Sequence, residues 1–265
     1  MRFTSIASGS SGNCIYTGSD QTHVLIDTGI SAKRIDQGLR ELGISGKEIG
    51  GILITHEHSD HICGLGVLLR KYQIPVYATA RTIRKILRTT SLGAVPEELF
   101  HPIQADESFQ IGDLEVQPIA ISHDAADPCA YRIEHEGKSA AVMTDLGEYS
   151  GYTINHLQDL DVLLLEANHD IRMLETGPYP YYLKQRILGT RGHLSNEAAG
   201  HLLCDVLHDN IKHIFLGHLS KENNYPDLAY ESVKVEISLG DCPYKGGDFP
   251  ITVAPREKMS EIIYF

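Results

Sequence analysis

The sequence predicts an α+β fold with two β-sheets and helices outside them. Short apolar segments recur along the 265 residues and alternate with segments of helical periodicity. One pair of apolar segments flanks a turn at residues 136–138, which predicts a hairpin. Hairpins mixed with strand–helix units are typical of sheets that pack in layers beneath helices.

Strands are expected where short apolar segments lie between polar turns. They cover residues 22–27, 51–55, 75–79, 115–122, 131–135, 139–145, 161–167, 213–217, 249–255 and 260–265. Three helices are also expected. The first runs from a cap at Ser31 to a stop at Gly43, with apolar residues at helical spacing between them. The others cover residues 80–93 and 195–209.

The composition indicates a reducing compartment. Five cysteines form no C-x-x-C pair, and their odd number argues against a disulfide framework. The first residues lack the apolar segment of a signal peptide, and no apolar run approaches about 18 residues. We therefore expect a cytoplasmic protein without membrane contact. No linker or repeat interrupts the chain, which favours a single domain over residues 1–265.

The formal net charge of −12 argues against a general attraction to nucleic acid, but the charges are unevenly distributed. Residues 61–96 contain no acid and six Lys or Arg. Four of these cations lie on one face of a predicted helix and form a basic stripe: Arg81, Arg84, Lys85 and Arg88. The stripe suits either binding to a phosphate backbone or an ordinary solvated helix face. Residues 176–196 also lack acids and contain three cations and three tyrosines, where bases could stack or the rings could pack beneath a loop.

The segment Thr55–His61, THEHSDH, contains three histidines and two carboxylates. It lies where a buried strand emerges into a loop, a common place for functional side chains. In an extended chain His56 and His58 point to the same side, and the following turn directs Asp60 and His61 elsewhere. Burying these groups together without a cation would leave repulsive or unsatisfied neighbours. The segment therefore predicts two adjacent sets of metal ligands.

Further ligands are expected from other strand ends, because this segment is too short to complete two coordination spheres. His123, Asp145 and His218 each follow an apolar segment, as the first motif does. Asp124 and Asp127 lie further into the loop after His123 and remain alternatives to it.

The motif H-x-H-x-D-H, followed by a lone His, a lone Asp and a final His at strand ends, resembles the metallo-β-lactamase fold. The resemblance covers essentially the whole chain and implies an αββα sandwich with a dinuclear metal site at one edge. By motif matching it assigns His56, His58 and His123 to one ion, Asp60, His61 and His218 to the other, and Asp145 to both.

The second half of the chain resembles nucleases of this superfamily. The segments RGHLSNEAAGHLL and IFLGHLSKENN are similar to tRNase Z, which implies that His193 is a general acid rather than a ligand. The interval between Asp145 and His193 is too short for the β-CASP insertion of RNase J, and no Gly/Pro-rich arm like that of tRNase Z is present. Together the motifs IASGSSGN, THEHSDHICGL, MTDLG, GHLSN and GHLSKENN closely resemble the YycJ/WalJ family of Gram-positive bacteria.

That resemblance implies a DNA exonuclease that acts from 5′ ends in mismatch repair. Two divalent ions about 3.5–4 Å apart can share a hydroxide that attacks the phosphodiester. Asp60 would belong to this catalytic centre, and His193 would protonate the leaving oxygen. Imidazole and carboxylate ligands without thiolate suit manganese, zinc or iron. The acidic chain is compatible with a partner protein that delivers DNA, but no residue identifies one.

Six further residues are expected to contact the substrate. The glycines of SGSSGN, residues 8–13, let backbone amides approach a phosphate or a terminal nucleotide, although the segment is equally well a plain turn. The expected contacts are Ser8, Ser10, Ser11, Asn13, Ser195 and Ser220.

Two other classes of protein remain open. The net negative charge and the missing insertions favour a small-molecule metallohydrolase of cyclic phosphodiesters, thioesters or lactones. A binding module that has lost turnover is disfavoured, because all seven candidate ligands are present. A strong salt dependence of DNA binding would separate the nuclease from the small-molecule hydrolase, since phosphate contacts release counterions.

Overall fold

The computed structural model describes all 265 residues, which divide into two compact units. Unit 1 comprises residues 1–120, 125–138 and 255–265, and unit 2 comprises residues 121–124 and 139–254. This division into compact units does not test the prediction of a single domain over residues 1–265, which stays a prediction. No helix is both long enough and apolar enough to cross a membrane.

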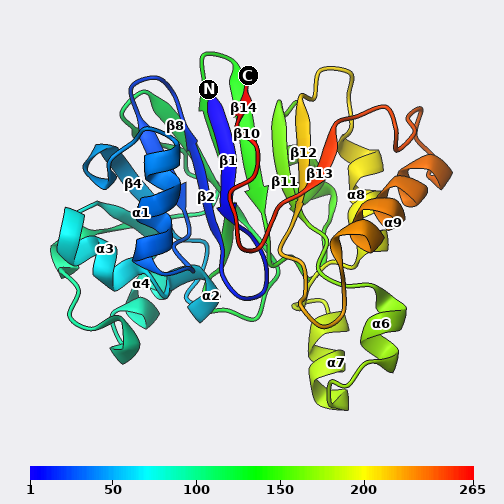
Figure 1. The fold of residues 1–265 in the computed structure, drawn as a ribbon, viewed down its shortest axis with the longest axis horizontal. Helices are drawn as coiled ribbons and strands as arrows, with labels where there is room; N and C mark the ends of the chain where they lie inside the picture. The colour runs from blue at the N-terminus through cyan, green and yellow to red at the C-terminus, as the bar shows by residue number, and fades with distance from the viewer. The chain divides into compact units, whose positions relative to one another are not determined.

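Unit 1 contains a seven-stranded sheet (Figure 1). Its first strands pair antiparallel, and the run from β3 to β6 is parallel. Because β3 and β4 are parallel neighbours, the residues that follow them emerge at the same edge of the sheet. The strand order is β14 (Ile263–Tyr264), β1 (Arg2–Ala7), β2 (Cys14–Gly18), β3 (His23–Ile26), β4 (Ile49–Leu53), β5 (Val76–Thr79) and β6 (Phe100–Ile103).

Helices pack on this sheet through a buried apolar cluster. Ile35 and Leu39 of one helix and Leu68 of another lie in the same cluster as Leu25 and Ile52 of the sheet. These side chains recur at helical or strand spacing, so one face of each element is apolar. The helical elements are α1 (Ala32–Glu41), η1 (Gly46–Glu48), α2 (Ser59–Ile62), α3 (Leu65–Tyr72), α4 (Ala80–Ile86), η2 (Thr90–Leu92) and η3 (Glu97–Leu99). Unit 1 also holds the antiparallel strands β7 (Phe109–Ile111), β8 (Leu114–Ala120) and β9 (Cys129–His135).

Unit 2 contains four neighbouring strands that all run parallel. They are β10 (Lys138–Met143), β11 (Val162–Glu166), β12 (His213–Gly217) and β13 (Ile251–Val253). Parallel strands bring their carboxyl ends to one edge, which is where this unit places its ionisable side chains. Its helices are α5 (Gly151–His156), α6 (Ile171–Thr176), α7 (Tyr181–Leu188), α8 (Asn196–Val206) and α9 (Pro226–Leu239). In Figure 1, α6 and α7 lie side by side, away from α8 and α9.

The predicted strands and helices are present, with shifts at their ends. Ser31 caps α1 through a hydrogen bond from the amide of Arg34, as expected. The helix predicted over residues 80–93 is shorter, because α4 ends at Ile86 and a separate 3₁₀ turn precedes Gly93. Thr89 donates its hydroxyl to the carbonyl oxygen of Lys85, a side-chain bond that competes with continued helix.

Candidate metal centre

The histidine-rich segment of unit 1 begins directly after β4. The rings of His56 and His58 lie 4.5 Å apart between centroids, and those of His56 and His61 lie 4.1 Å apart. His58 precedes the short helix α2, which carries Asp60 and His61. A side-chain oxygen of Asp60 lies 3.5 Å from Nε2 of His61. The local chain therefore gathers three imidazoles and a carboxylate, as the sequence predicts.

A buried aspartate at the end of β3 holds this segment in place. Asp27 accepts hydrogen bonds from the amide and hydroxyl of Thr55 and from Nδ1 of His61 (2.7 Å). Since the Thr55 hydroxyl donates to Asp27, its oxygen accepts from Nδ1 of His56 (3.0 Å). Both imidazoles therefore carry their proton on Nδ1, which leaves the lone pair on Nε2 for a metal.

The glycine-containing loop between β1 and β2 supports the same segment. The amide of Asn13 donates to the carbonyl oxygen of Asp60 (2.8 Å), and Nδ2 of Asn13 lies 3.3 Å from Nε2 of His61. Gly29 lies so close to α2 that a Cβ atom there would be 1.6 Å from the same carbonyl oxygen. Only glycine permits this approach, so the sequence DTG after β3 is adapted to the histidine segment.

Unit 2 gathers a second cluster at the carboxyl ends of its parallel strands. Asp145 follows β10, Glu166 ends β11 and His218 follows β12. Together with His193, they offer four potential ligand atoms that lie within 4.8 Å of one another. Asp145 and His218 adopt positive φ angles of 58° and 54°, which is uncommon for residues other than glycine. Strained backbone that the surrounding structure maintains is concentrated at functional sites.

Glu166 is the buried centre of this cluster. Oε1 accepts from Nδ1 of His193 and from Nδ1 of His218, each at 2.8 Å. Oε2 accepts from the amides of Leu146 (2.9 Å) and Leu194 (3.1 Å). Burial alone would raise the pKa of Glu166, but the charges and hydrogen bonds of the two histidines lower the pKa to about 2. Glu166 is therefore ionised, and the tautomer that it imposes leaves the lone pair of His218 on Nε2.

His123 places another imidazole beside Asp145 in unit 2. It donates from Nδ1 to the carbonyl oxygen of Gly192 (3.1 Å) and directs Nε2 toward Asp145 (3.6 Å from Oδ1). His218 places its own Nε2 at the same 3.6 Å from that oxygen. Burial lowers the pKa of His123 below its ordinary value, which favours the neutral form that binds metal. Oδ1 of the rival Asp124 lies 3.4 Å from the same Nε2 atom, and Asp124 also forms an ion pair with the Arg186 guanidinium.

His193 differs from the other imidazoles of unit 2. Its side chain is 16 % exposed, whereas that of His218 is 2 % exposed. Burial would lower the pKa of His193, but the charge and hydrogen bond of Glu166 raise the pKa above its ordinary value. Nδ1 of His193 is bound to Glu166, so Nε2 is the nitrogen that remains for another partner.

The residues predicted to contact substrate fall into two groups. Ser8 and Asn13 are buried and bond each other within their loop, whereas Ser10 and Ser11 are exposed and accept from the Arg256 guanidinium. Ser195 accepts from the amide of Ala198 as the cap of α8, and Ser220 accepts from the amide of Asn223. Each hydroxyl that accepts a bond still carries a proton to donate, so the substrate contacts stay predictions.

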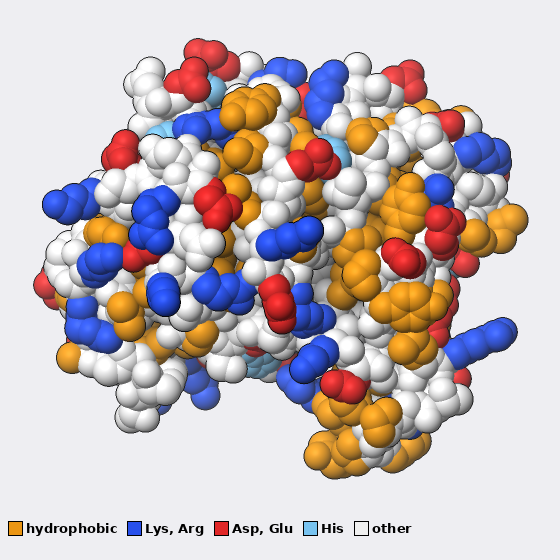
Figure 2. All heavy atoms as spheres, in the orientation of Figure 1, with side chains coloured by type: hydrophobic (Ala, Val, Ile, Leu, Met, Phe, Trp, Pro, Cys, Tyr) orange, Lys and Arg blue, Asp and Glu red, His pale blue; other side chains and the backbone are white.

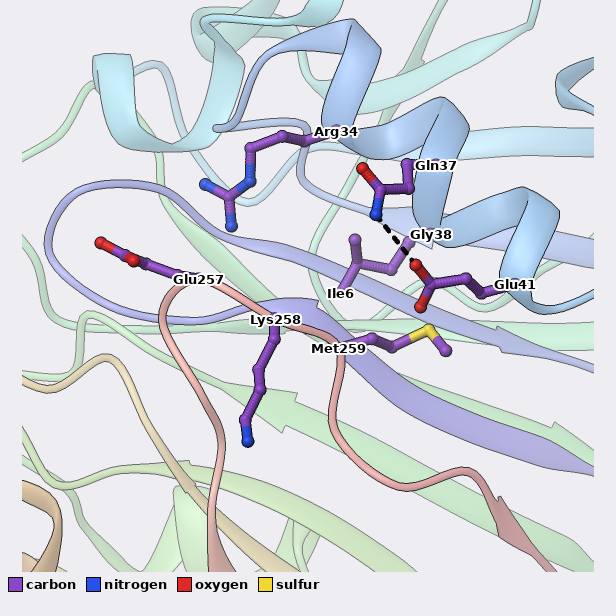
Figure 3. Close-up of a pocket in the computed structure, with 8 residues that line it drawn as sticks. All are labelled: Ile6, Arg34, Gln37, Gly38, Glu41, Glu257, Lys258 and Met259. Carbon is purple, nitrogen blue, oxygen red and sulfur yellow. Dashed lines mark hydrogen bonds between the residues drawn. The ribbon is translucent and has the colours of Figure 1, made fainter.

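Arg256 belongs to a C-terminal segment that packs against α1. Figure 3 shows the cavity between them, with a volume of about 110 Å³. Arg34, on the wall of this cavity, donates to the carbonyl oxygen of Arg256, and Gln37 donates to Glu41 across one helical turn. The segment therefore anchors Arg256 beside the serine loop in unit 1.

Sequence reasoning missed Asp27 and Glu166. Both lie at the ends of buried apolar strands, and both hold imidazoles by Nδ1. The available signal was an acidic residue at the end of an apolar segment, but a single acid in that position is common. The donor groups of both units suit divalent metal ions. In each unit, imidazole Nε2 atoms lie beside a carboxylate, and no thiolate is among the donors.

Comparison with known proteins identifies the family. The sequence profile described as "Beta-lactamase superfamily domain" matches residues 22–216. The chain is 39% identical over 233 residues to "Exodeoxyribonuclease YycJ" of Bacillus anthracis, covering 88% of each chain. It is 38% identical over 251 residues to "Exodeoxyribonuclease WalJ" of Streptococcus pneumoniae serotype 2, covering 95% of this chain and 93% of the relative.

Solved structures agree on the fold. The metallo-β-lactamase fold protein YhfI from Bacillus subtilis has a TM-score of 0.71 at 16% identity, covering 98% of this chain and 99% of its own. The short form of human tRNase Z has a TM-score of 0.66 at 17% identity and full coverage of both chains, 100%. The chain therefore belongs to the β-lactamase superfamily and has the metallo-β-lactamase fold, which confirms the predicted fold class. Within that superfamily it belongs to the YycJ/WalJ family and is a metal-dependent hydrolase.

Proposed function

We propose that the protein is a metal-dependent exonuclease that removes nucleotides from the 5′ ends of DNA. The observation that carries this proposal is the 38–39% identity, over 88–95% of the chain, to proteins named exodeoxyribonucleases. The 5′ polarity rests on the family resemblance of the motifs. The donor chemistry of each unit supports the metal dependence, since imidazole and carboxylate groups converge in both.

The metal ligands are proposed from motif matching within the family. His56, His58 and His123 bind one divalent ion, Asp60, His61 and His218 bind the other, and Asp145 contacts both. Support comes from the histidines whose Nδ1 atom is bound within its own unit, because this leaves Nε2 to the metal. Nitrogen and oxygen donors accept manganese, zinc or iron. When bound, such ions lower the pKa of water toward neutrality and neutralise a phosphodiester.

His193 is the proposed general acid. Cleavage of a phosphodiester leaves an alkoxide, which needs a proton as the bond breaks. Nδ1 of His193 donates to Glu166, so the proton for the leaving oxygen comes from Nε2. The buried carboxylate raises the pKa of His193, which keeps the imidazole protonated closer to neutral pH.

The biological setting follows from the same resemblance. The protein acts in the cytoplasm in DNA mismatch repair, where removal of a nicked strand requires an exonuclease. A partner protein that delivers the DNA end would overcome the unfavourable net charge of −12. Excision from a nick in mismatched plasmid DNA, compared with a matched plasmid, tests this role.

The direct test is digestion of end-labelled, 5′-phosphorylated DNA and RNA, single- and double-stranded, with added manganese or zinc. We expect stepwise release of mononucleotides from the 5′ end of DNA, and none with the Asp145→Ala variant. If the metal-loaded protein cleaves no polymer but hydrolyses a cyclic phosphodiester, thioester or lactone, the nuclease proposal is wrong. Metal analysis of the same samples would identify the ions and their number.

A further inference from the structure

Helix α7 in unit 2 carries two adjacent tyrosines that are largely exposed. Tyr181 is 76% exposed and Tyr182 is 75% exposed. Figure 2 shows hydrophobic side chains gathered over the α6–α7 region at the lower right. Apolar rings with polar tips are typical of binding surfaces, because one body offers both stacking area and a hydroxyl.

The other end of α7 is tied to the metal-donor cluster of unit 2. Nη2 of Arg186 donates to Asp124 (3.0 Å), the residue next to His123. The carbonyl oxygen of Ile187 accepts from the amide of His193 (3.0 Å). These contacts fix the tyrosines on the same rigid element that positions the proposed general acid and a proposed ligand.

The charge around α7 suits a polyanion. Lys184 donates to the carbonyl oxygen of Glu175, and Arg191 donates twice to the carbonyl oxygen of His123. Neither cation is paired with a carboxylate, and Arg191 is exposed while Lys184 is partly exposed. Residues 176–196 contain no acid that would repel a phosphate.

We propose that Tyr181 and Tyr182 form a stacking platform for the bases of single-stranded DNA, while Lys184 and Arg191 attract its phosphates. This inference rests on the proposed function and names the form of substrate that the same centre accepts. Stacking on aromatic rings tolerates any base, as an exonuclease that digests DNA of any sequence requires. A second copy of this chain would also cover the rings, but an interface between copies would gain nothing from uncompensated cations.

The test measures affinity and cleavage separately in the metal-loaded full chain. Affinity is measured by fluorescence anisotropy with a single-stranded oligonucleotide whose phosphorothioate linkages resist hydrolysis. A matched oligonucleotide lacks bases at its 5′-terminal positions. The variants are Tyr181→Ala with Tyr182→Ala, the corresponding double phenylalanine variant, and Tyr264→Ala as a control at a 70% exposed tyrosine of unit 1.

We expect the double alanine variant to bind the intact strand at least about tenfold more weakly, because it loses the stacking of bases on both rings. The phenylalanine variant and Tyr264→Ala should retain wild-type affinity. With the abasic strand, the wild type and the double alanine variant should bind equally weakly. Equal losses for intact and abasic strands would overturn the proposal, since the tyrosines would then act without the bases.

The outcomes also separate this inference from the exonuclease proposal. If the wild type binds the intact strand through the tyrosines but cleaves no DNA, the platform stands and the exonuclease proposal fails. If the double alanine variant cleaves DNA with unchanged KM and affinity, the exonuclease proposal stands and the platform fails. A shift from dimer to monomer in the same variant, with unchanged DNA affinity, would identify an interface between copies and overturn the platform.

Discussion

The two units hold their imidazoles by the same device but assemble them differently. In unit 1 the donors are contiguous in one segment, and Asp27 holds His61 directly and His56 through the Thr55 hydroxyl. In unit 2 the donors arrive from separate segments of the chain, and Glu166 holds both His193 and His218. A buried carboxylate thus fixes the tautomer of the imidazoles in each unit. Glu166 fixes it both for His218, an expected metal ligand, and for His193, the expected general acid.

The backbone shows the same parallel. Asp27 in unit 1 and Asp145 and His218 in unit 2 all have positive φ angles within two residues of a strand end. A turn of this kind redirects the side chain at the sheet edge at a cost of about 1–3 kcal/mol per residue. Both units therefore sacrifice stability at the strand ends to orient ionisable groups.

The largest effect is expected for Asp145→Ala. Oδ1 of this carboxylate lies 3.6 Å from Nε2 of both His123 and His218. The substitution therefore removes the one carboxylate that lies beside both of these proposed metal ligands. We expect nuclease activity to fall about a thousandfold or more, with a parallel loss of bound metal measured by elemental analysis. Asp205→Ala, at an exposed acid of α8, is the control and should change neither. An Asp145→Ala protein with full metal content would contradict the assignment.

The variants Glu166→Gln and Asp27→Asn test which of the two buried carboxylates contributes more to metal affinity. Replacing one oxygen of Glu166 by an amide disrupts either two imidazole bonds or two backbone bonds. Asp27→Asn disrupts fewer imidazole contacts, since it bonds one histidine directly. Loss of such supporting groups weakens metal affinity by about 10- to 100-fold, and we expect Glu166→Gln near the upper limit. Metal titration would refute the comparison if Asp27→Asn were the weaker binder.

Gly29→Ala tests how closely unit 1 is packed behind the histidine segment. A Cβ atom 1.6 Å from the carbonyl oxygen of Asp60 cannot be accommodated without moving α2. We expect the free energy of unfolding to fall by about 3 kcal/mol or more. Gly151→Ala is the matched control, because a Cβ atom there meets nothing within 4 Å. Similar denaturation curves for the two variants would show that the segment adapts easily.

Ser195→Ala should have the smallest effect. The hydroxyl caps α8, and losing such a cap costs about 1 kcal/mol. If capping is its whole role, urea denaturation shifts while KM for DNA stays within about twofold. A KM increase of about tenfold would show that Ser195 also contacts substrate, as the sequence predicts.

Much of this architecture could be predicted because its determinants are local. Apolar segments define the strands, and the contiguous donors of THEHSDH stand out from any background of surface histidines. The resemblance of these motifs to the metallo-β-lactamase fold then predicted the αββα sandwich. Asp27 and Glu166 could not be found in this way, because their role depends on strands that become neighbours only after folding. The inward orientation of Asn13 likewise depends on its contact with Asp60, which lies far along the chain.

The most direct test of the account is to measure metal content and cleavage rate together in the wild type and in His193→Ala. We predict two equivalents of divalent metal in both proteins, with cleavage by the variant slowed by about 10²- to 10⁴-fold. A substrate with a nitrophenolate leaving group, which needs no proton, should restore most of the rate. If His193→Ala instead loses one equivalent of metal, His193 is a ligand. The assignment of His218 as a ligand and His193 as the general acid beside Glu166 is then wrong.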